Sequence, residues 1–210
     1  MLNTYPAMAT LLQESIPSAA TPELRVSGRM QRQARQGCGP NWVALPNTIG
    51  FVDPLHSTGI AHSLSGVERL AEIFLYSQDT SADVSAYASD VYKELHFIDR
   101  LISGCYKLMP SKRHFEAYCM LYFTAAHNYE TQRMESQANR TVPGIFLSDD
   151  PQMVDLIEQG FELACRIEAS GDWTEPVLFE QQIRNLISPV DRIGLCNPEL
   201  CSMYASTAVL

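Results

Sequence analysis

The residues of this 210-residue chain that most clearly suggest chemistry form the segment DPLHSTG, from Asp53 to Gly59. An acid, a proline and small residues come just before an amphipathic run, so the segment predicts a turn that leads into a helix. The first N–H groups of a helix have no partner within it and lie at the positive end of its dipole. We therefore expect Ser57, Thr58 and Gly59 to offer unpaired amides that hold negative charge.

The side chains of this segment suit a ligand as well. Gly59 has no side chain to keep a ligand away, and the Asp53 carboxylate could accept hydrogen bonds from ligand hydroxyls. His56 could donate or accept a proton near neutral pH, or it could simply line the turn. The alternative is purely structural, with Ser57 or Thr58 as a helix cap and Asp53 as a turn residue. The residues alone leave both interpretations open.

The elements that position this segment are mostly helices. After Pro/Ser/Ala-rich sequence and an extended stretch over 24–36, WVALP at 42–46 predicts a short strand. Apolar periodicity then predicts helices from residue 57 onward, with Thr80 or Ser81 capping the second and Met109-Pro110 ending it. The expected helices are 5–16, 57–76, a second long helix that begins after Thr80 or Ser81 and stops at Met109-Pro110, then 111 to the polar loop at 136–143, 148–169 and 174–187.

Two of these helices carry apolar stripes that predict buried faces. The stripe of the 57–76 helix comprises Ile60, Leu64, Val67, Ala71 and Phe74. The stripe of the helix that follows Thr80 or Ser81 comprises Val84, Val91, Leu95, Ile98, Leu101 and Ile102. His62, on the first of these helices, is expected to be a packed or exposed histidine and not a ligand.

The composition limits the partners of the chain. Its 24 acidic and 15 basic residues give a net charge of -9, which opposes attraction to nucleic acid and to anionic membrane surfaces. Arg29, Arg32 and Arg35 form a basic run that indicates a solvated face or a local positive patch. No apolar run approaches membrane-spanning length and no leader pattern is present, so we expect a cytoplasmic protein with neither nucleic acid nor membrane as partner.

The six cysteines are scattered, without a CxxC pair or a histidine at ligand spacing. We therefore predict reduced, mostly buried thiols and no metal site. Cys196 and Cys201 lie close enough in sequence to cross-link, but a reducing compartment makes this the weaker alternative.

The stretch NWVALPNTIGFVDPLHSTGIAHSLSGVERLAEIF, at 41–74, resembles the C-terminal half of flavin-dependent halogenases. It is similar to tryptophan-halogenase-like FAD-dependent oxidoreductases, which carry the signature G-F-[VI]-D-P-L-x-S-T-G-[IF]. The resemblance is strongest over 41–75 and continues weakly to about residue 135.

The resemblance implies roles for the motif residues in binding FAD. Asp53 is expected near the ribityl chain, and the other cofactor-binding positions beside the isoalloxazine ring are Pro54, Ser57, Thr58, Gly59 and Ile60. It further implies that the backbone at Thr58 and Gly59 holds a halide. These halogenases typically have Glu where this chain has His56, so His56 is the catalytic candidate and activity on tryptophan is not implied.

The implied fold is mainly α with a small β portion, the C-terminal part of a Rossmann-type FAD-dependent monooxygenase or halogenase. We expect residues 1–56 to be a partial β-rich segment of the FAD-binding domain and 57–210 to be a helical C-terminal domain. The strand-linked GxGxxG turn and the W-x-W-x-I-P segment of the family are missing, so the dinucleotide-binding half is expected to be absent.

Two functions follow from these expectations. The first is an FAD-dependent oxidoreductase, of which this chain is a fragment that acts on a small organic substrate in the full-length context. The second is a noncatalytic helical interaction module that self-associates or docks to a Rossmann half.

Overall fold

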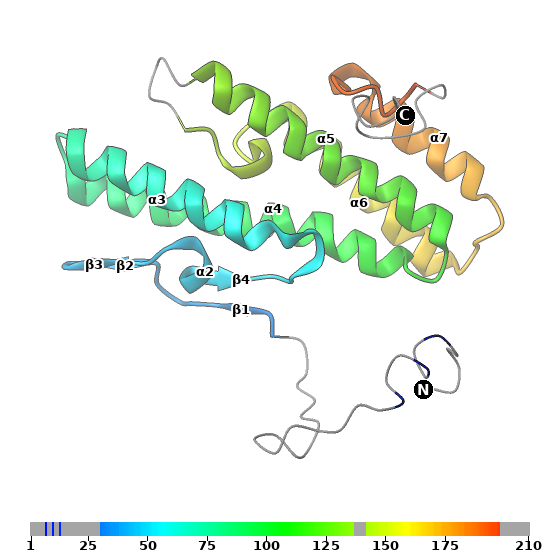
Figure 1. The fold of residues 1–210 in the computed structure, drawn as a ribbon, viewed down its shortest axis with the longest axis horizontal. Helices are drawn as coiled ribbons and strands as arrows, with labels where there is room; N and C mark the ends of the chain where they lie inside the picture. Colours follow the sequence, from blue (N-terminus) through cyan, green and yellow to red (C-terminus); the bar gives the residue numbers. More distant parts are fainter. Residues whose placement is uncertain (1–6, 8–9, 11–12, 14–29, 137–141, 198–210) are drawn as a thin grey trace. The chain divides into compact units, whose positions relative to one another are not determined.

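The computed structural model describes residues 7, 10, 13, 30–136 and 142–197 (Figure 1). The chain divides into two compact units, Met1–Met30 and Gln31–Leu210, and every element below belongs to the second. The helix expected over 5–16 lies almost entirely outside the described residues. The same holds for 24–29 of the expected extended stretch, for Arg29, for most of the polar loop and for Cys201.

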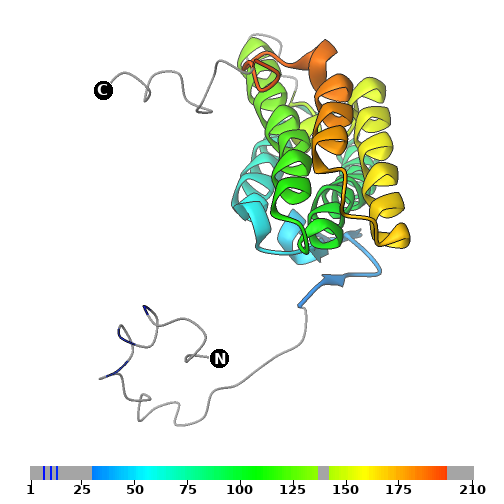
Figure 2. The same cartoon turned by 90° about the vertical axis from the view of Figure 1, so that its right-hand side faces the viewer.

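The second unit consists of long helices preceded by very short strands (Figures 1 and 2). The strands are β1 (Arg32–Gln33), β2 (Cys38–Gly39), β3 (Trp42–Val43) and β4 (Gly50–Phe51). The helices are α2 (Pro46–Ile49), α3 (Thr58–Tyr76), α4 (Thr80–Leu108), α5 (Lys112–Ser136), α6 (Pro151–Ser170) and α7 (Pro176–Ile187). Short 3₁₀ turns are η2 (Leu55–Ser57), η4 (Ile145–Leu147) and η5 (Ser188–Val190).

Helix ends follow the sequence signals closely. At the start of α4 the Asp79 carboxylate accepts the Ala82 N–H at 3.0 Å, so the cap is Asp79 and not Thr80 or Ser81 as predicted. The helix ends just before Met109-Pro110, as expected. In α6 the Asp150 carboxylate caps the first turn, and Gly171 ends the helix with a positive φ of 64°.

Helices α4 to α7 enclose the main apolar core. α5 packs on α7 and α4, and α4 packs on α6; Figure 2 shows α5, α7 and α6 side by side. The predicted stripe of α4 is buried along its whole length, which confirms that prediction. Fully buried side chains of this core include Leu101, Ile102, Leu108, Leu121, Ile157, Ile183 and Ile187.

The β portion consists of two antiparallel ladders of two residues a strand, with Arg32 opposite Phe51 and Cys38 opposite Val43. The strand predicted over 42–46 ends at Val43, and Pro46 instead begins α2. Proline suits the first position of a helix because its ring fixes φ and it lacks the N–H that would be unpaired there. Because the ladders are so short, their position depends on packing against α4, which β2 and β4 both contact.

Helix α3 is oriented differently from the prediction. Its apolar stripe is exposed within the described structure, with exposed fractions of 73% for Ile60, 63% for Leu64 and 59% for Phe74. The prediction that this face is packed was therefore wrong for the described residues. The buried side instead consists of Thr58, His62, Ser65, Gly66 and Leu70.

Close packing explains why small and polar residues line the buried side of α3. A Cβ on Gly66 would lie 2.4 Å from the ring of Pro46 and 2.9 Å from the Tyr87 hydroxyl, so only glycine permits this approach of α3 to α2 and α4. No described helix is both long enough and apolar enough to cross a membrane.

Candidate functional site

The predicted motif forms a tight turn between β4 and α3 (Figure 1). His56 and Ser57 both adopt left-handed backbone conformations, with φ of 62° and 56°. Such conformations cost non-glycine residues roughly 1–3 kcal/mol each, so surrounding contacts must hold them. Backbone strain of this kind is concentrated at functional sites.

Hydrogen bonds from two helices hold the turn. The Tyr106 hydroxyl of α4 donates to both carboxylate oxygens of Asp53 at 3.0 Å, and the Leu55 N–H donates to one of them at 2.9 Å. On the other side, the Tyr122 hydroxyl of α5 donates to the His56 carbonyl oxygen at 3.1 Å. The motif is therefore fixed to the bundle at Asp53 and at His56.

The amides expected to bind an anion are not all available. The Ser57 N–H donates to the Pro54 carbonyl oxygen at 2.9 Å, which corrects the expectation that it is unpaired. A Cβ on Gly59 would lie 3.2 Å from the Asn47 amide nitrogen, which itself donates to the Gly59 carbonyl. Close approach of Asn47 thus accounts for glycine here without any ligand.

The motif side chains divide into an inward and an outward set. Asp53 and Thr58 are buried, with 8% and 5% of their surface exposed, whereas Pro54, Ser57 and Ile60 are exposed. The outward set is continuous in sequence with the exposed apolar stripe of α3. The turn therefore presents Pro54, Ser57 and Ile60 outward, while Asp53 and Thr58 are buried.

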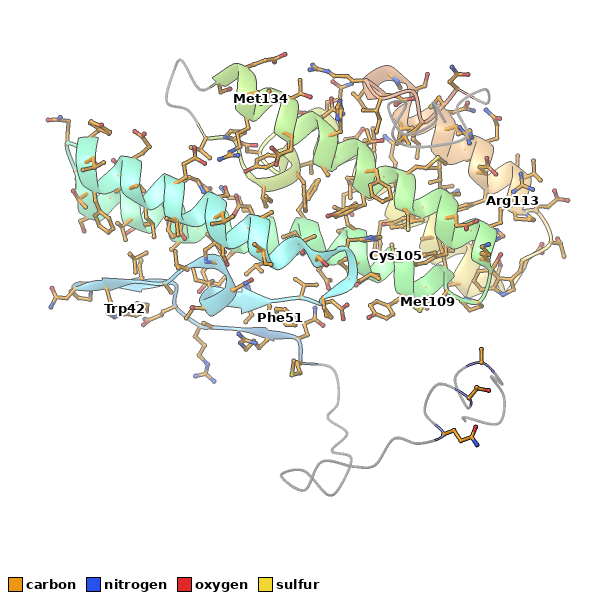
Figure 3. All side chains as sticks on the ribbon, viewed as in Figure 1. Trp42, Phe51, Cys105, Met109, Arg113 and Met134 are labelled. Atoms are coloured by element: carbon orange, nitrogen blue, oxygen red, sulfur yellow. The ribbon has the colours of Figure 1, made fainter. Side chains whose placement is uncertain are left out.

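His56 lies against two thiols that are remote in sequence. Its Nε2 atom is 3.5 Å from Cys105 Sγ of α4 and 3.8 Å from Cys119 Sγ of α5, and the two sulfur atoms are 4.0 Å apart. Both cysteines are buried. Cys105 is labelled in Figure 3, where α4 passes below α5. We refer to His56, Cys105 and Cys119 as the thiol–imidazole cluster.

The cluster changes the acidity of its thiols. The hydrogen bond between the two thiols and the neighbouring His56 imidazole lower the pKa of Cys119 to about 6, against the opposing effect of burial. The same hydrogen bond, together with burial, raises the pKa of Cys105. One thiolate shared within this pair is a good nucleophile and a good ligand for a soft metal ion.

Aromatic packing fixes the imidazole in place. The His56 ring stacks on Tyr122, with a centroid distance of 4.3 Å and an interplanar angle of 18°. Tyr122 in turn contacts Phe123 and Phe146 edge-on. Tyr122 and Phe123, which pack against the apolar core, thus also border the turn.

Sequence reasoning missed Tyr106, Tyr122 and the two cysteines. They are between 49 and 66 residues away from their partners in the turn, so no local spacing could reveal the contacts. The one hint in the sequence was that Cys119 and Tyr122 lie three residues apart, about one helical turn, in the helix predicted from residue 111 onward.

A second buried polar cluster lies along α3 and α4. Glu94 Oε2 is 2.9 Å from His62 Nε2 and 2.8 Å from the Arg69 guanidinium, while Glu94 Oε1 accepts the Ile145 N–H at 3.1 Å. Burial alone would raise the pKa of Glu94, but the hydrogen bond from His62 and the charge of Arg69 outweigh it and lower the pKa. His62 was expected to be either packed or exposed, and in the structure it is buried.

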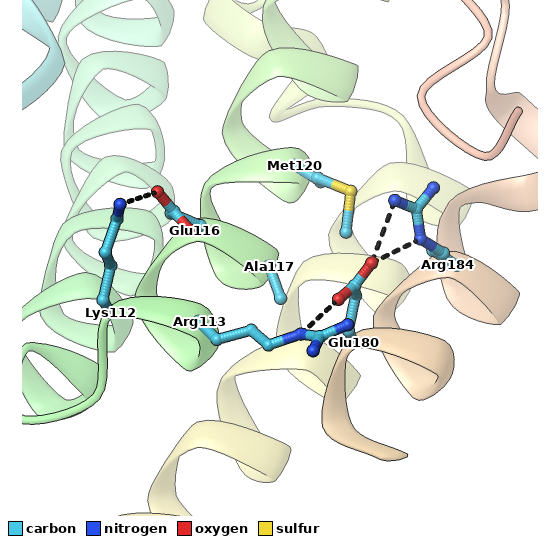
Figure 4. Close-up of a pocket in the computed structure, with 7 residues that line it drawn as sticks. All are labelled: Lys112, Arg113, Glu116, Ala117, Met120, Glu180 and Arg184. Carbon is cyan, nitrogen blue, oxygen red and sulfur yellow. Dashed lines mark hydrogen bonds and ion pairs between the residues drawn. The ribbon is translucent and has the colours of Figure 1, made fainter. Parts of the chain in front are cut away.

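Two cavities lie elsewhere in the described structure. One, of about 400 Å³, lies between α5 and α7 and is lined largely by ion-paired side chains (Figure 4). Its Glu180 carboxylate is bonded by the guanidinium groups of Arg113 and Arg184, so its charges are already paired. The other, of about 860 Å³, is formed by residues 38–43, Phe74 and the first turns of α4. Neither includes a predicted site residue.

The sequence matches the tryptophan halogenase family over residues 3–141. This is well over half of the chain and includes the whole turn and the helices α3 to α5. The chain therefore belongs to the tryptophan halogenase family, as the DPLHSTG motif predicted.

Solved halogenase structures share the fold. The structure of halogenase PltM in complex with phloroglucinol and FAD has a TM-score of 0.72 and 16% identity, covering 93% of this chain and 43% of that one. A second structure of halogenase PltM has a TM-score of 0.69 and 16% identity, covering 90% of this chain and 41% of that one. The chain thus spans less than half the length of these proteins. No curated protein matches the sequence.

These findings confirm the predicted fold class, a mainly α chain with a small β portion that corresponds to part of a halogenase fold. At such low identity the likeness establishes the fold alone. The domain boundary between residues 56 and 57 stays a prediction, as do the roles of the motif residues.

Proposed function

We propose that this chain is the flavin-edge and substrate-side portion of an FAD-dependent halogenase-like oxidoreductase. The observation that carries this proposal is the turn GFVDPLHSTGI, placed before α3 in a chain of the tryptophan halogenase family. Two further points support it: PltM, which shares the fold, has a structure with FAD and phloroglucinol, and the turn itself is strained. The substrate of the complete protein would be a small organic molecule.

The residues of the turn suit a flavin in part. Asp53 is held in place by Tyr106, and its carboxylate oxygens would accept hydrogen bonds from ribityl hydroxyls. The outward surface of Pro54, Ser57 and Ile60 would lie beside the ring system. FAD, when bound, supplies the oxygen and redox chemistry, and the protein supplies orientation and charge stabilisation.

The beginning of α3 would stabilise negative charge. Since the Ser57 N–H is bonded within the turn, Thr58 and Gly59 are the positions proposed to hold the anionic flavin edge or a halide. For His56 we propose a positioning role and not proton transfer, because its ring is stacked on Tyr122 and its Nε2 atom faces two thiols.

Titration with FAD tests this function. The chain alone should bind FAD weakly, because half a binding site loses most of its binding energy, and the addition of an FAD-binding half from a member of the family should strengthen binding at least tenfold. Asp53→Asn should then weaken it by about 10–100-fold, the value of one hydrogen bond to a charged group. Flavin fluorescence measures each dissociation constant.

Asp90→Asn is the matched control. Asp90 is 52% exposed on α4 and pairs only with Lys93 among the ion pairs of the described residues, so its replacement should leave FAD binding unchanged. No binding in the presence of the FAD-binding half, with the circular dichroism of the chain intact, would refute the proposal. Equal losses for the two variants would refute the role of Asp53.

A second function, a noncatalytic module that docks to another chain, is favoured by the exposed stripe of α3. Ile60, Leu64 and Phe74 stand on one side of the helix, and large apolar surfaces of this kind mark interaction sites. We propose that the occupant of this face is an FAD-binding Rossmann-type half, because the chain spans only 41% to 43% of the halogenases that share its fold.

Sedimentation velocity tests whether the chain associates with a partner or stays monomeric. The wild type should form a complex with the FAD-binding half or associate with itself, and Leu64→Asp should abolish both. Leu178→Asp, at a residue 55% exposed on α7, is the control and should change neither. A wild type that sediments as a monomer, with and without the FAD-binding half, would exclude docking.

A further inference from the structure

The thiol–imidazole cluster brings three potential metal ligands together at the point where the motif turn, α4 and α5 meet. His56 offers Nε2, Cys105 and Cys119 each offer Sγ, and these atoms all lie within 4.8 Å of one another. Neither the family motif nor the proposed flavin site uses the two thiols. The cluster therefore requires an explanation of its own.

The separations of the three atoms match those around a tetrahedral zinc ion. Zn–S bonds of about 2.3 Å and Zn–N bonds of about 2.0–2.1 Å place two sulfur ligands about 3.8 Å apart, and a sulfur and a nitrogen ligand about 3.6 Å apart. The observed separations are 4.0 Å between the sulfur atoms and 3.5 Å and 3.8 Å from sulfur to Nε2. A metal ion would fit with shifts of only a few tenths of an ångström.

From this geometry we propose that His56, Cys105 and Cys119 form a binding site for one zinc ion. Zinc is a borderline-soft ion that takes thiolate and imidazole ligands together. Three protein ligands leave the fourth tetrahedral position for a water molecule or another small ligand.

Charge and burial favour this occupant. With both thiols deprotonated and the protons released to solvent, the ion, two thiolates and a neutral imidazole form a cluster with no net charge. Such a neutral cluster avoids the cost of placing an isolated charge among buried groups, since Cys105 is 0% and Cys119 is 8% exposed.

The scaffold already holds the ligands in position. The His56 ring is fixed by stacking on Tyr122, and its backbone is fixed by the Tyr122 hydroxyl. The two cysteines belong to long, well-packed helices. A bound ion would join the strained turn to α4 and α5 and so stabilise the segment that carries Asp53 and Thr58.

Metal binding is measured on the full chain, without FAD, so its failure is distinguishable from failure of the proposed flavin function. Zinc titration against a chromophoric chelator should give one ion per chain. Substitution by cobalt should produce visible bands of tetrahedral intensity and a sulfur-to-cobalt charge-transfer band. X-ray absorption of the zinc-loaded wild type should show two sulfur and one nitrogen ligand, at about 2.3 Å and about 2.0 Å.

Variants locate the site. Cys105→Ser, Cys119→Ser and His56→Gln should each weaken zinc binding at least about 100-fold, beyond the 10–100-fold effect usual for outer-shell partners. Cys38→Ser, at a half-buried thiol of β2, is the matched control and should bind zinc like the wild type. The zinc-loaded wild type should also unfold at a higher temperature than the metal-free chain.

Three results would overturn the proposal. The first is the absence of stoichiometric zinc binding by the folded wild type. The second is a ligand shell without two sulfur atoms, which the spectra of the wild type reveal even if a variant fails to fold. The third is equal affinity of the three cluster variants and the Cys38→Ser control.

Discussion

Helices α3 and α4 run beside each other but bury opposite kinds of side chain. α4 buries an apolar stripe that includes Val91, Leu101 and Ile102, and the bundle formed with α5 and α6 covers it. α3 buries Thr58, His62 and Ser65, while its large apolar residues are exposed. Both helices carry an apolar face, and only that of α4 is covered by the described part of the chain.

This difference explains how α3 is held and what it is available for. Its inner side is attached to α4 mainly by the buried polar cluster of Glu94, His62 and Arg69, which we call the Glu94 cluster, and by close packing at Gly66. Within the described structure, an extended apolar core does not hold it. Its outer side exposes Ile60, Leu64 and Phe74 and follows in sequence the exposed Pro54 and Ser57 of the turn. In a chain that spans less than half of its structural relatives, we interpret this surface as the side that meets the flavin-binding half.

The largest expected effect comes from the polar attachment of α3. Glu94→Gln removes the buried negative charge that is bonded by His62 and by Arg69. Arg69 is itself only 12% exposed. Breaking a buried charge pair from one side costs about 3–5 kcal/mol, so we expect a loss of unfolding free energy of that size in urea denaturation. Glu116→Gln, at an exposed ion pair with Lys112, should change it by less than about 1 kcal/mol. Equal effects would show that the Glu94 cluster does not anchor α3.

The next effect sharpens the contrast between the two apolar faces. Leu101→Ala leaves a cavity in the α4 core and should cost about 2–5 kcal/mol of unfolding free energy. The same change at Leu64, which is 63% exposed on α3, should cost less than about 1 kcal/mol. Chemical denaturation of the two variants checks this, and similar losses would mean that α3 has a covered apolar face after all.

A pH series tests the same attachment by another route. The folded pKa of Glu94 lies below its unfolded value of about 4.3, so its carboxylate stabilises the fold above that pH. This stability should be lost as the pH falls through the folded pKa. Glu180 and Asp191 shift in the same direction, so the difference between wild type and Glu94→Gln isolates the Glu94 contribution. A difference that does not shrink in acid would contradict the prediction.

The smallest effect concerns the turn. Tyr106→Phe removes the hydroxyl that bonds both oxygens of Asp53, and because Tyr106 is 41% exposed we expect a loss of only about 1 kcal/mol. The thermal unfolding midpoint measures it. Tyr92→Phe, which removes an exposed hydrogen bond to the Ala34 carbonyl, is the control on the same helix. A Tyr106→Phe loss no larger than that of the control would show that Asp53 is held by other contacts.

The sequence predicted the helices well because their signals are local. Ser148 with the acidic residues and Pro151 that follow it predicted the start of α6 to within a turn, and Met109-Pro110 predicted the end of α4. The α4 stripe follows directly from helical spacing. The DPLHSTG motif likewise predicted the family, because a long contiguous signature survives low identity.

What the sequence could not predict depends on long-range contacts. Periodicity identified the apolar stripe of α3 but could not predict which face of the helix is buried. The polar face is buried because His62 and Arg69 bond to Glu94 on α4. The thiol–imidazole cluster joins residues on three elements, and the pairing of Ser57 with Pro54 depends on the left-handed turn. Each of these features is set by tertiary packing and not by neighbours in sequence.

Hydrogen exchange of the chain, alone and mixed with an FAD-binding half and FAD, tests the central claim most directly. If the FAD-binding half covers the outer face of α3, exchange over residues 53–76 should be slower in the mixture than in the chain alone. Exchange of α6 at 151–170 should stay unchanged and serves as the internal reference. Unchanged exchange over 53–76, or equal slowing in α6, would contradict the account.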